Sequence, residues 1–131
     1  MEFVIKETAS NLSFPGPAEI VDSFGNLPDA DQESFWVLGL DAQNREILRK
    51  CLFLGGLRSC TVDPKIVFKR LLVSNCSAFV VVHNHPSGNT APSAEDKTFT
   101  KMLKDGGEIL DIKLLDSIII GDGGQFSQVV I

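Results

Sequence analysis

Hydrophobic and polar positions change period along the chain, and the first half predicts a helix and a hairpin. A short helical pattern covers 18–24. The run from Glu33 to Leu40 is rich in strand formers, and turn residues at 41–44 separate it from a second extended run, 46–54. These two runs predict a pair of antiparallel strands.

A helix and a central strand follow. Asp63 before Pro64 is typical of a helix start, and apolar residues spaced for one buried face continue to about Asn75. The run 78–83 is apolar without alternation, which is typical of a strand covered on both faces. This strand is expected at the centre of the sheet.

The last third returns to helical and then extended spacing. A third helix is predicted from Ser93 to Lys104, with Gly106 and Gly107 as its stop. An extended run at 109–120, a glycine-rich turn and a last strand at 126–131 follow.

The order of these elements predicts a single-domain α/β fold, a mixed sheet with flanking helices. Its 131 residues are enough for one ordinary domain with a real core. We assign the domain to residues 31–131 and treat residues 1–30 as an N-terminal lead-in with a short helix.

Composition indicates the compartment. The longest apolar run, 78–82, is too short to cross a bilayer, and the N-terminus lacks the cationic and apolar pattern of a secretory signal. Cys51, Cys60 and Cys76 form no CxxC pair and are odd in number, which favours a reduced compartment and core positions. A cytoplasmic protein without a membrane partner is therefore expected.

The formal charge of -5 hides an uneven distribution. Residues 45–70 hold seven basic and two acidic side chains, or +5, so the remainder carries -10. A solvated face is the simpler interpretation, and a cationic surface for an anionic partner is the alternative.

Both histidines fall at the end of the predicted central strand, in the order His83-Asn84-His85-Pro86. Because strand side chains alternate, His83 and His85 should point to the same side. Asp96 follows in the first turn of the helix that Ser93 should cap. Two imidazoles and one carboxylate suit zinc, and three protein ligands leave a fourth position for water, as in catalytic sites.

Each signal also has a simpler interpretation. His83 and His85 fit two half-exposed rings at a strand end, and Asp96 fits a capping-box carboxylate that binds the Ser93 N–H. Because the chain's entire histidine content lies in one turn near this aspartate, the metal interpretation is favoured.

The segment 83–88, HNHPSG, followed by PSAED at 92–96, closely resembles the motif of the bacterial RadC family. Its spacing is that of the wider JAMM, or MPN-type, zinc metallopeptidases, and the likeness extends from about Glu33 to Ile131. The resemblance implies a cytidine-deaminase-like α/β fold and one zinc ion. The implied zinc ligands are His83, His85 and Asp96, with Ser93 hydrogen-bonded to the zinc water or the developing oxyanion.

Such an enzyme also needs a general base. JAMM enzymes place a glutamate some tens of residues before the histidines, beside a short apolar stretch. Glu33 fits that place best, Glu46 is the runner-up, and a solvated residue at a strand start is the alternative for Glu33.

The chain departs from the family pattern in two places. Typical RadC chains carry an N-terminal helix-hairpin-helix region that binds DNA nonspecifically, and 30 leading residues cannot hold it, which argues against direct DNA binding. Where the family usually reads Asp-His-Ile, this chain has Ser117 as the middle residue. The three implied metal ligands are untouched by that change.

Three functions follow from the resemblance. The first is a zinc metallopeptidase that cleaves a peptide or isopeptide bond in an unknown protein or peptide substrate. The second is a non-catalytic role in DNA repair or mobile-element biology, through DNA or a DNA-bound partner. The third is a metal-binding domain that has lost its activity.

Overall fold

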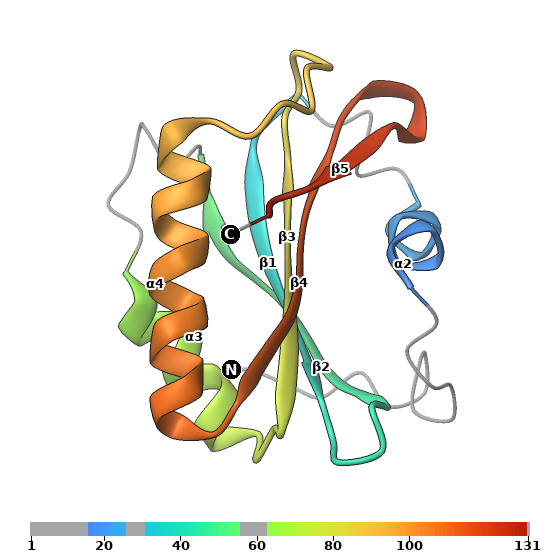
Figure 1. Ribbon diagram of the computed structural model, residues 1–131. Helices are drawn as coiled ribbons and strands as arrows, with labels where there is room; N and C mark the ends of the chain where they lie inside the picture. The colour runs from blue at the N-terminus through green and yellow to red at the C-terminus, as the bar shows by residue number, and fades with distance from the viewer. Residues whose placement is uncertain (1–15, 26–30, 56–62, 131) are drawn as a thin grey trace.

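The computed structural model describes residues 16–25, 31–55 and 63–130 (Figure 1). The elements follow the predicted order, with a short helix ahead of them. They are α2 (Pro17–Ser23), β1 (Ser34–Leu40), β2 (Glu46–Leu54), α3 (Pro64–Val73), β3 (Ala78–Asn84), α4 (Ala94–Leu110), β4 (Lys113–Ile120), the 3-10 turn η2 (Asp122–Gly124) and β5 (Phe126–Gln128).

One mixed five-stranded sheet, in the order β2-β1-β3-β4-β5, forms the middle layer. The central strand β3 is antiparallel to β1 and parallel to β4, and all seven of its residues are buried. Helices α3 and α4 cover one face of the sheet, and α2 lies against the other (Figure 1). The predicted single-domain α/β class and the central position of the apolar strand are confirmed.

The two faces of β3 belong to two separate cores. Phe79 and Val81 pack with residues of α3 and α4, whereas Val80 and Val82 pack on the opposite face with residues of α2. This alternation decides where the next residues of the strand point. His83 continues the series that faces α4.

The predicted start of α3 is confirmed. The Asp63 side chain accepts a hydrogen bond of 2.9 Å from the Lys65 N–H, and Pro64 takes the first helical position, where its missing N–H costs nothing. Helix α3 therefore begins at the residue that the sequence identified.

The predicted stop of α4 at Gly106 and Gly107 is wrong. The helix continues to Leu110 and ends at Asp111, which adopts a left-handed conformation with φ 59°. Both glycines instead allow close packing. A Cβ on Gly106 would lie 2.9 Å from the Phe68 ring, and a Cβ on Gly107 would lie 2.3 Å from the Ile112 carbonyl oxygen.

The limits of the last two strands also differ from the prediction. Residues 109 and 110 belong to α4, so β4 begins at Lys113 rather than at 109. The strand β5 is shorter than the predicted run of 126–131, and Ile131 lies outside the described residues. Of the cysteines, Cys76 is buried and Cys51 is half-buried, while Cys60 is outside the described part.

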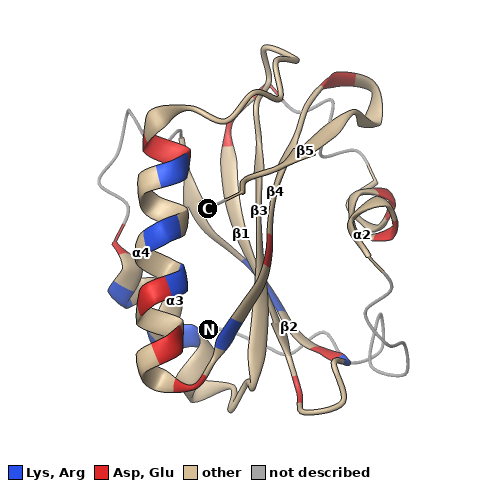
Figure 2. Ribbon diagram, viewed as in Figure 1, with Lys and Arg blue, Asp and Glu red and all other residues tan. Residues whose placement is uncertain are grey.

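Along α4, acidic residues lie towards both ends of the helix, and Lys97, Lys101 and Lys104 lie between them (Figure 2). In the basic segment, Arg45 pairs with Asp41 at 2.9 Å and Arg49 pairs with Glu46 at 2.6 Å. These pairs neutralise two of the segment's cations locally. No helix within the described ranges is long and apolar enough to cross a membrane.

Candidate metal centre

The end of β3 brings the two imidazoles together. His83 is the penultimate residue of the strand, and the His85 N–H donates to the Ile120 carbonyl at 2.8 Å, which continues the pairing with β4 beyond Asn84. The two rings therefore lie on the same side of the strand, with their centroids 4.8 Å apart and their planes 89° apart. His83 is buried, and His85 is partly exposed.

Asp96 contacts both imidazoles and also caps α4. The Ser93 hydroxyl accepts from the Asp96 N–H at 3.0 Å, and Asp96 Oδ2 accepts from the Ser93 N–H at 2.8 Å, which completes a capping box. Asp96 Oδ1 lies 3.2 Å from His83 Nδ1, and Oδ2 lies 3.3 Å from His85 Nε2. The capping interpretation is therefore confirmed, and the same carboxylate also lies beside both imidazoles.

The Asp96 carboxylate is held in its ionised form. Its burial alone would raise its pKa, but hydrogen bonds from His83, His85 and Ser93 outweigh burial and hold the pKa well below its usual range. The hydrogen bond to Asp96 raises the pKa of His85 in turn, against the opposing effect of burial. A buried negative charge between two imidazoles favours a cation at this place.

The hydrogen bonds of His85 identify the free nitrogen of its ring. Its Nδ1 lies 2.8 Å from the Asn89 carbonyl oxygen, which can only accept, so Nδ1 carries the proton. In a neutral ring Nε2 then presents a bare lone pair to a carboxylate oxygen. Only a proton or a metal ion relieves that repulsion, and metal-binding histidines commonly donate their other N–H to a carbonyl in this way.

Glu33 supplies a second carboxylate beside His83. Its Oε2 lies 3.8 Å from His83 Nε2, a buried nitrogen that has no hydrogen-bond partner among the described residues. One ligand atom from each of Glu33, His83 and His85 lies within 4.8 Å of the others, so these three side chains could hold a metal ion. This group differs from the predicted ligand set in its carboxylate, with Glu33 in place of Asp96.

Glu46, the runner-up for the general base, lies elsewhere. Its carboxylate forms a bidentate pair with Arg49, with distances of 2.6 and 2.7 Å. The register pairs Glu46 with Leu40 at one end of β1, whereas His83 pairs with Phe35 at the other end. The structure therefore brings Glu33, and not Glu46, to the histidines.

These side chains open onto a pocket of about 280 Å³. Sequence reasoning did not identify Ser87, Asn89 and Ala91 as part of its wall. Nor did it find the Asn89 carbonyl, because the hydrogen-bonding role of a backbone group leaves no residue signal. The full lining is Glu33, His83, His85, Ser87, Asn89, Ala91, Ser93 and Asp96.

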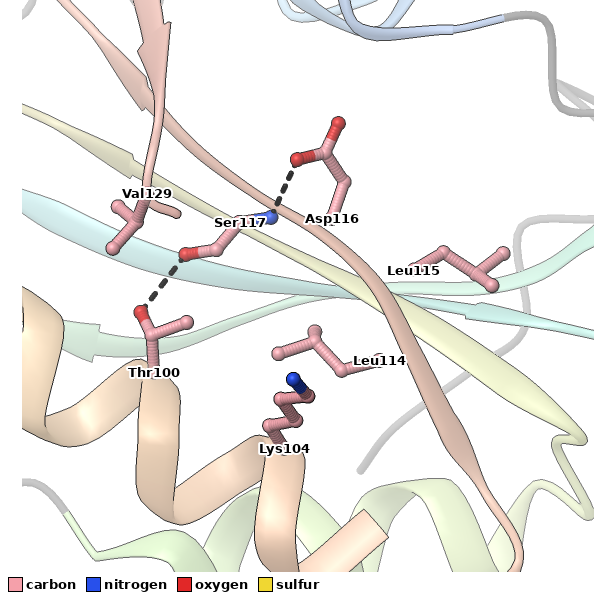
Figure 3. Close-up of a pocket in the computed structure, with 7 residues that line it drawn as sticks. All are labelled: Thr100, Lys104, Leu114, Leu115, Asp116, Ser117 and Val129. Atoms are coloured by element: carbon pink, nitrogen blue, oxygen red, sulfur yellow. Dashed lines mark hydrogen bonds between the residues drawn. The ribbon is translucent and has the colours of Figure 1, made fainter. Parts of the chain in front are cut away.

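Ser117 lies away from this pocket, at a second one of about 120 Å³ between α4 and β4 that shares none of its lining residues (Figure 3). Its buried hydroxyl pairs with that of Thr100 at 3.0 Å. A small cavity of about 10 Å³ touches both Ser117 and Thr100 on one side and His83 and Asp96 on the other. Ser117 therefore packs behind the candidate centre.

The chain is similar to a described protein family and to several curated proteins. A family model described as "RadC-like JAB domain" matches residues 16–129. A UPF0758 protein of Trichlorobacter lovleyi is 44% identical over 88% of this chain and 51% of its own length. UPF0758 proteins of Staphylococcus carnosus (39% identical; 95% of this chain, 56% of their own) and Chlorobaculum tepidum (34%; 89% and 53%) are also similar. The chain spans about half the length of these curated relatives.

Proposed function

Because the chain belongs to the RadC-like JAB domain family, we propose that it is a zinc-dependent hydrolase of peptide or isopeptide bonds. One observation carries the proposal. His85 Nε2 and the ionised Asp96 carboxylate lie 3.3 Å apart at an open pocket, so a cation between them would be bound by both groups.

We assign zinc binding to His83, His85 and Asp96. Zinc bonds of about 2.0–2.1 Å in a tetrahedron separate neighbouring ligand atoms by roughly 3.3 Å, and the separation of His85 Nε2 and Asp96 Oδ2 agrees with that value. The buried Nε2 of His83, which has no hydrogen-bond partner among the described residues, is a second nitrogen that could bind the ion. One zinc ion per chain is expected.

The two carboxylates differ in a way that suggests different roles. Asp96 is 4% exposed, held by the capping box and ionised, as a ligand must be. The Glu33 side chain is 35% exposed, so it reaches both the centre and solvent, as a proton shuttle must. Glu33 is therefore assigned as the general base, a role worth about two to four orders of magnitude in rate.

Zinc bound here would supply a water acidified to a pKa of about 7 and would polarise a carbonyl group. Glu33 takes the proton of the attacking water and returns it to the leaving amine. The Ser93 oxygen already accepts from the Asp96 N–H, so its own hydroxyl proton is free to donate to the developing oxyanion.

Metal analysis tests the proposal directly. Protein purified without chelator should contain about one zinc per chain, and His85→Ala should lose it while keeping its circular dichroism spectrum. Lys101→Ala, on the exposed surface of α4, serves as the matched control and should keep the metal. A folded wild-type protein that takes up no zinc would refute the proposal.

Cleavage is measured separately, with a peptide library and an isopeptide-linked substrate. Glu33→Gln should abolish turnover while zinc remains bound. Equal turnover in the wild type and in this variant would rule out Glu33 as the base.

A role through DNA is the second proposal, motivated by the family and by the basic segment. Contacts with phosphates would make the affinity fall steeply with ionic strength. Absence of binding to duplex DNA at low salt would exclude direct contact and leave only a DNA-bound partner.

A further inference from the structure

Asn84 lies between the two candidate ligands but points away from them. It is 1% exposed, and the alternation of β3 places it in the series of Val80 and Val82, on the face opposite His83. It is not among the residues that line the candidate pocket. A buried amide on an apolar face needs hydrogen-bond partners, and those partners indicate what it does.

Within the described part of the chain, the hydrogen bonds of the Asn84 amide go to the residues on either side of Glu33. Its Oδ1 accepts from the Ser34 N–H and from the Ser34 hydroxyl, both at 2.7 Å. Its Nδ2 donates to the Gln32 carbonyl at 3.1 Å. One side chain thus binds the backbone before and after Glu33, about 50 residues away in the sequence.

The hydrogen bonds of the Asn84 side chain lie beyond the point where the backbone pairing of β1 with β3 ends. The register of β1 against β3 stops at Phe35 opposite His83, and Glu33 precedes the first residue of β1. A primary amide offers one acceptor and one donor side, like a peptide group, so Asn84 extends the ladder with its side chain. On the other side, the Gly55 N–H donates to the Glu33 carbonyl at 2.8 Å.

The arrangement is reinforced by a further hydrogen bond, from Trp36 to Ser34. The Ser34 hydroxyl donates to Asn84 and accepts from Trp36 Nε1 at 2.9 Å, so its orientation is fixed. Two of these three partners, Asn84 and Ser34, are buried, where an unmade hydrogen bond is expensive. The backbone around Glu33 is therefore held firmly, although the Glu33 side chain itself is partly exposed.

We propose that Asn84 is a positioning residue, which holds the backbone on both sides of Glu33 so that the Glu33 carboxylate stays beside His83. The inference rests on the proposed function, in which Glu33 acts on the attacking water. It assigns different tasks to three consecutive residues: His83 and His85 present nitrogen donors on one face, and Asn84 aligns the base from the other.

The test compares Asn84→Leu with Val82→Ala, a change at a similarly buried side chain on the same face that has no hydrogen-bonding group. In metal-free protein, Asn84→Leu should lose the protection of the Ser34 amide against hydrogen exchange, and Val82→Ala should keep it. This arm needs neither metal nor activity. Unchanged protection in a folded Asn84→Leu protein would overturn the proposal.

Cobalt(II) substitution reports on the centre itself, because the visible spectrum is sensitive to the groups around the ion. Glu33→Gln and Asn84→Leu should change the spectrum in the same direction, and the double variant should change it no further than Glu33→Gln alone. An added change in the double variant would show that Asn84 acts through the histidines, and would overturn the proposal. A wild type that takes up no cobalt would instead refute the proposed function.

Turnover completes the test where the wild type cleaves a substrate. Asn84→Leu should lower kcat by up to about 100-fold with little change in KM, because a base displaced by about 1 Å loses alignment without affecting substrate binding. In the Glu33→Gln background the same substitution should have no effect. If Asn84→Leu fails to fold, Asn84→Asp, which keeps the acceptor and loses the donor to Gln32, should show a smaller change of the same kind.

Discussion

The sharpest prediction concerns which carboxylate binds the metal, and it compares Asp96→Asn with Glu33→Gln. Each substitution keeps the size of the side chain and removes its charge. Loss of a supporting contact around a bound metal costs about 10- to 100-fold in affinity. If Asp96 is a ligand, Asp96→Asn should weaken zinc binding by more than about 100-fold, and Glu33→Gln should weaken it by less.

The same substitutions should differ in metal-free protein. Asp96 accepts hydrogen bonds from Ser93 and from both imidazoles. A hydrogen bond to a charged group contributes about 1.5–3 kcal/mol to the free energy of unfolding. We expect Asp96→Asn to lower the free energy of unfolding by about 2 kcal/mol, or Tm by roughly 6–10 °C in a domain of this size. Asp105→Asn, which removes an exposed charge from the same helix, is the control and should cost little.

The pH dependence carries a definite sign. Because the pKa of Asp96 is lowered by folding, its contribution to stability is present above the unfolded value of about 4 and is lost as the pH falls. The difference in unfolding free energy between wild type and Asp96→Asn should therefore shrink below about pH 4. Chelator competition measures the affinities, and urea unfolding with EDTA measures the stabilities. Tight zinc binding by Asp96→Asn together with its loss in Glu33→Gln would refute the assignment and make Glu33 the ligand.

Three further predictions follow from the fold. Burial raises the pKa of the Cys76 thiol to about 11, so wild-type stability in urea should fall as the pH rises from about 9 towards 11, and Cys76→Ala should show a shallower slope. Glu46→Gln breaks the bidentate pair with Arg49 and should cost about 3 kcal/mol in chemical unfolding while leaving zinc content unchanged; zinc loss would contradict its exclusion from the centre. Gly107→Ala places a methyl group against the Ile112 carbonyl, so it should destabilise the protein by at least about 1–3 kcal/mol in thermal unfolding, and an equal or higher Tm would contradict the packing role.

Local signals were sufficient for most of the fold because they act over a few residues. Asp63 and Ser93 cap their helices as expected, since a capping side chain binds N–H groups two or three positions away. The local pattern was wrong for Gly106 and Gly107, which it predicted to end α4. Their role depends on Phe68 and Ile112, and contacts with those residues leave no mark in the local pattern.

In the candidate centre, too, some relations between residues follow from the local sequence and others only from tertiary structure. The spacing of His83 and His85 in a strand requires their rings to share a face, and the Ser93 cap places Asp96 in the first turn of its helix, so the sequence by itself determined these relations. Which of Glu33 and Glu46 lies near the histidines depended on which end of β1 is beside His83, and the bond from Asn84 to the Ser34 N–H joins residues 50 positions apart. Only the tertiary structure decided these points, because register and long-range hydrogen bonds arise from packing of the whole sheet rather than from neighbouring residues.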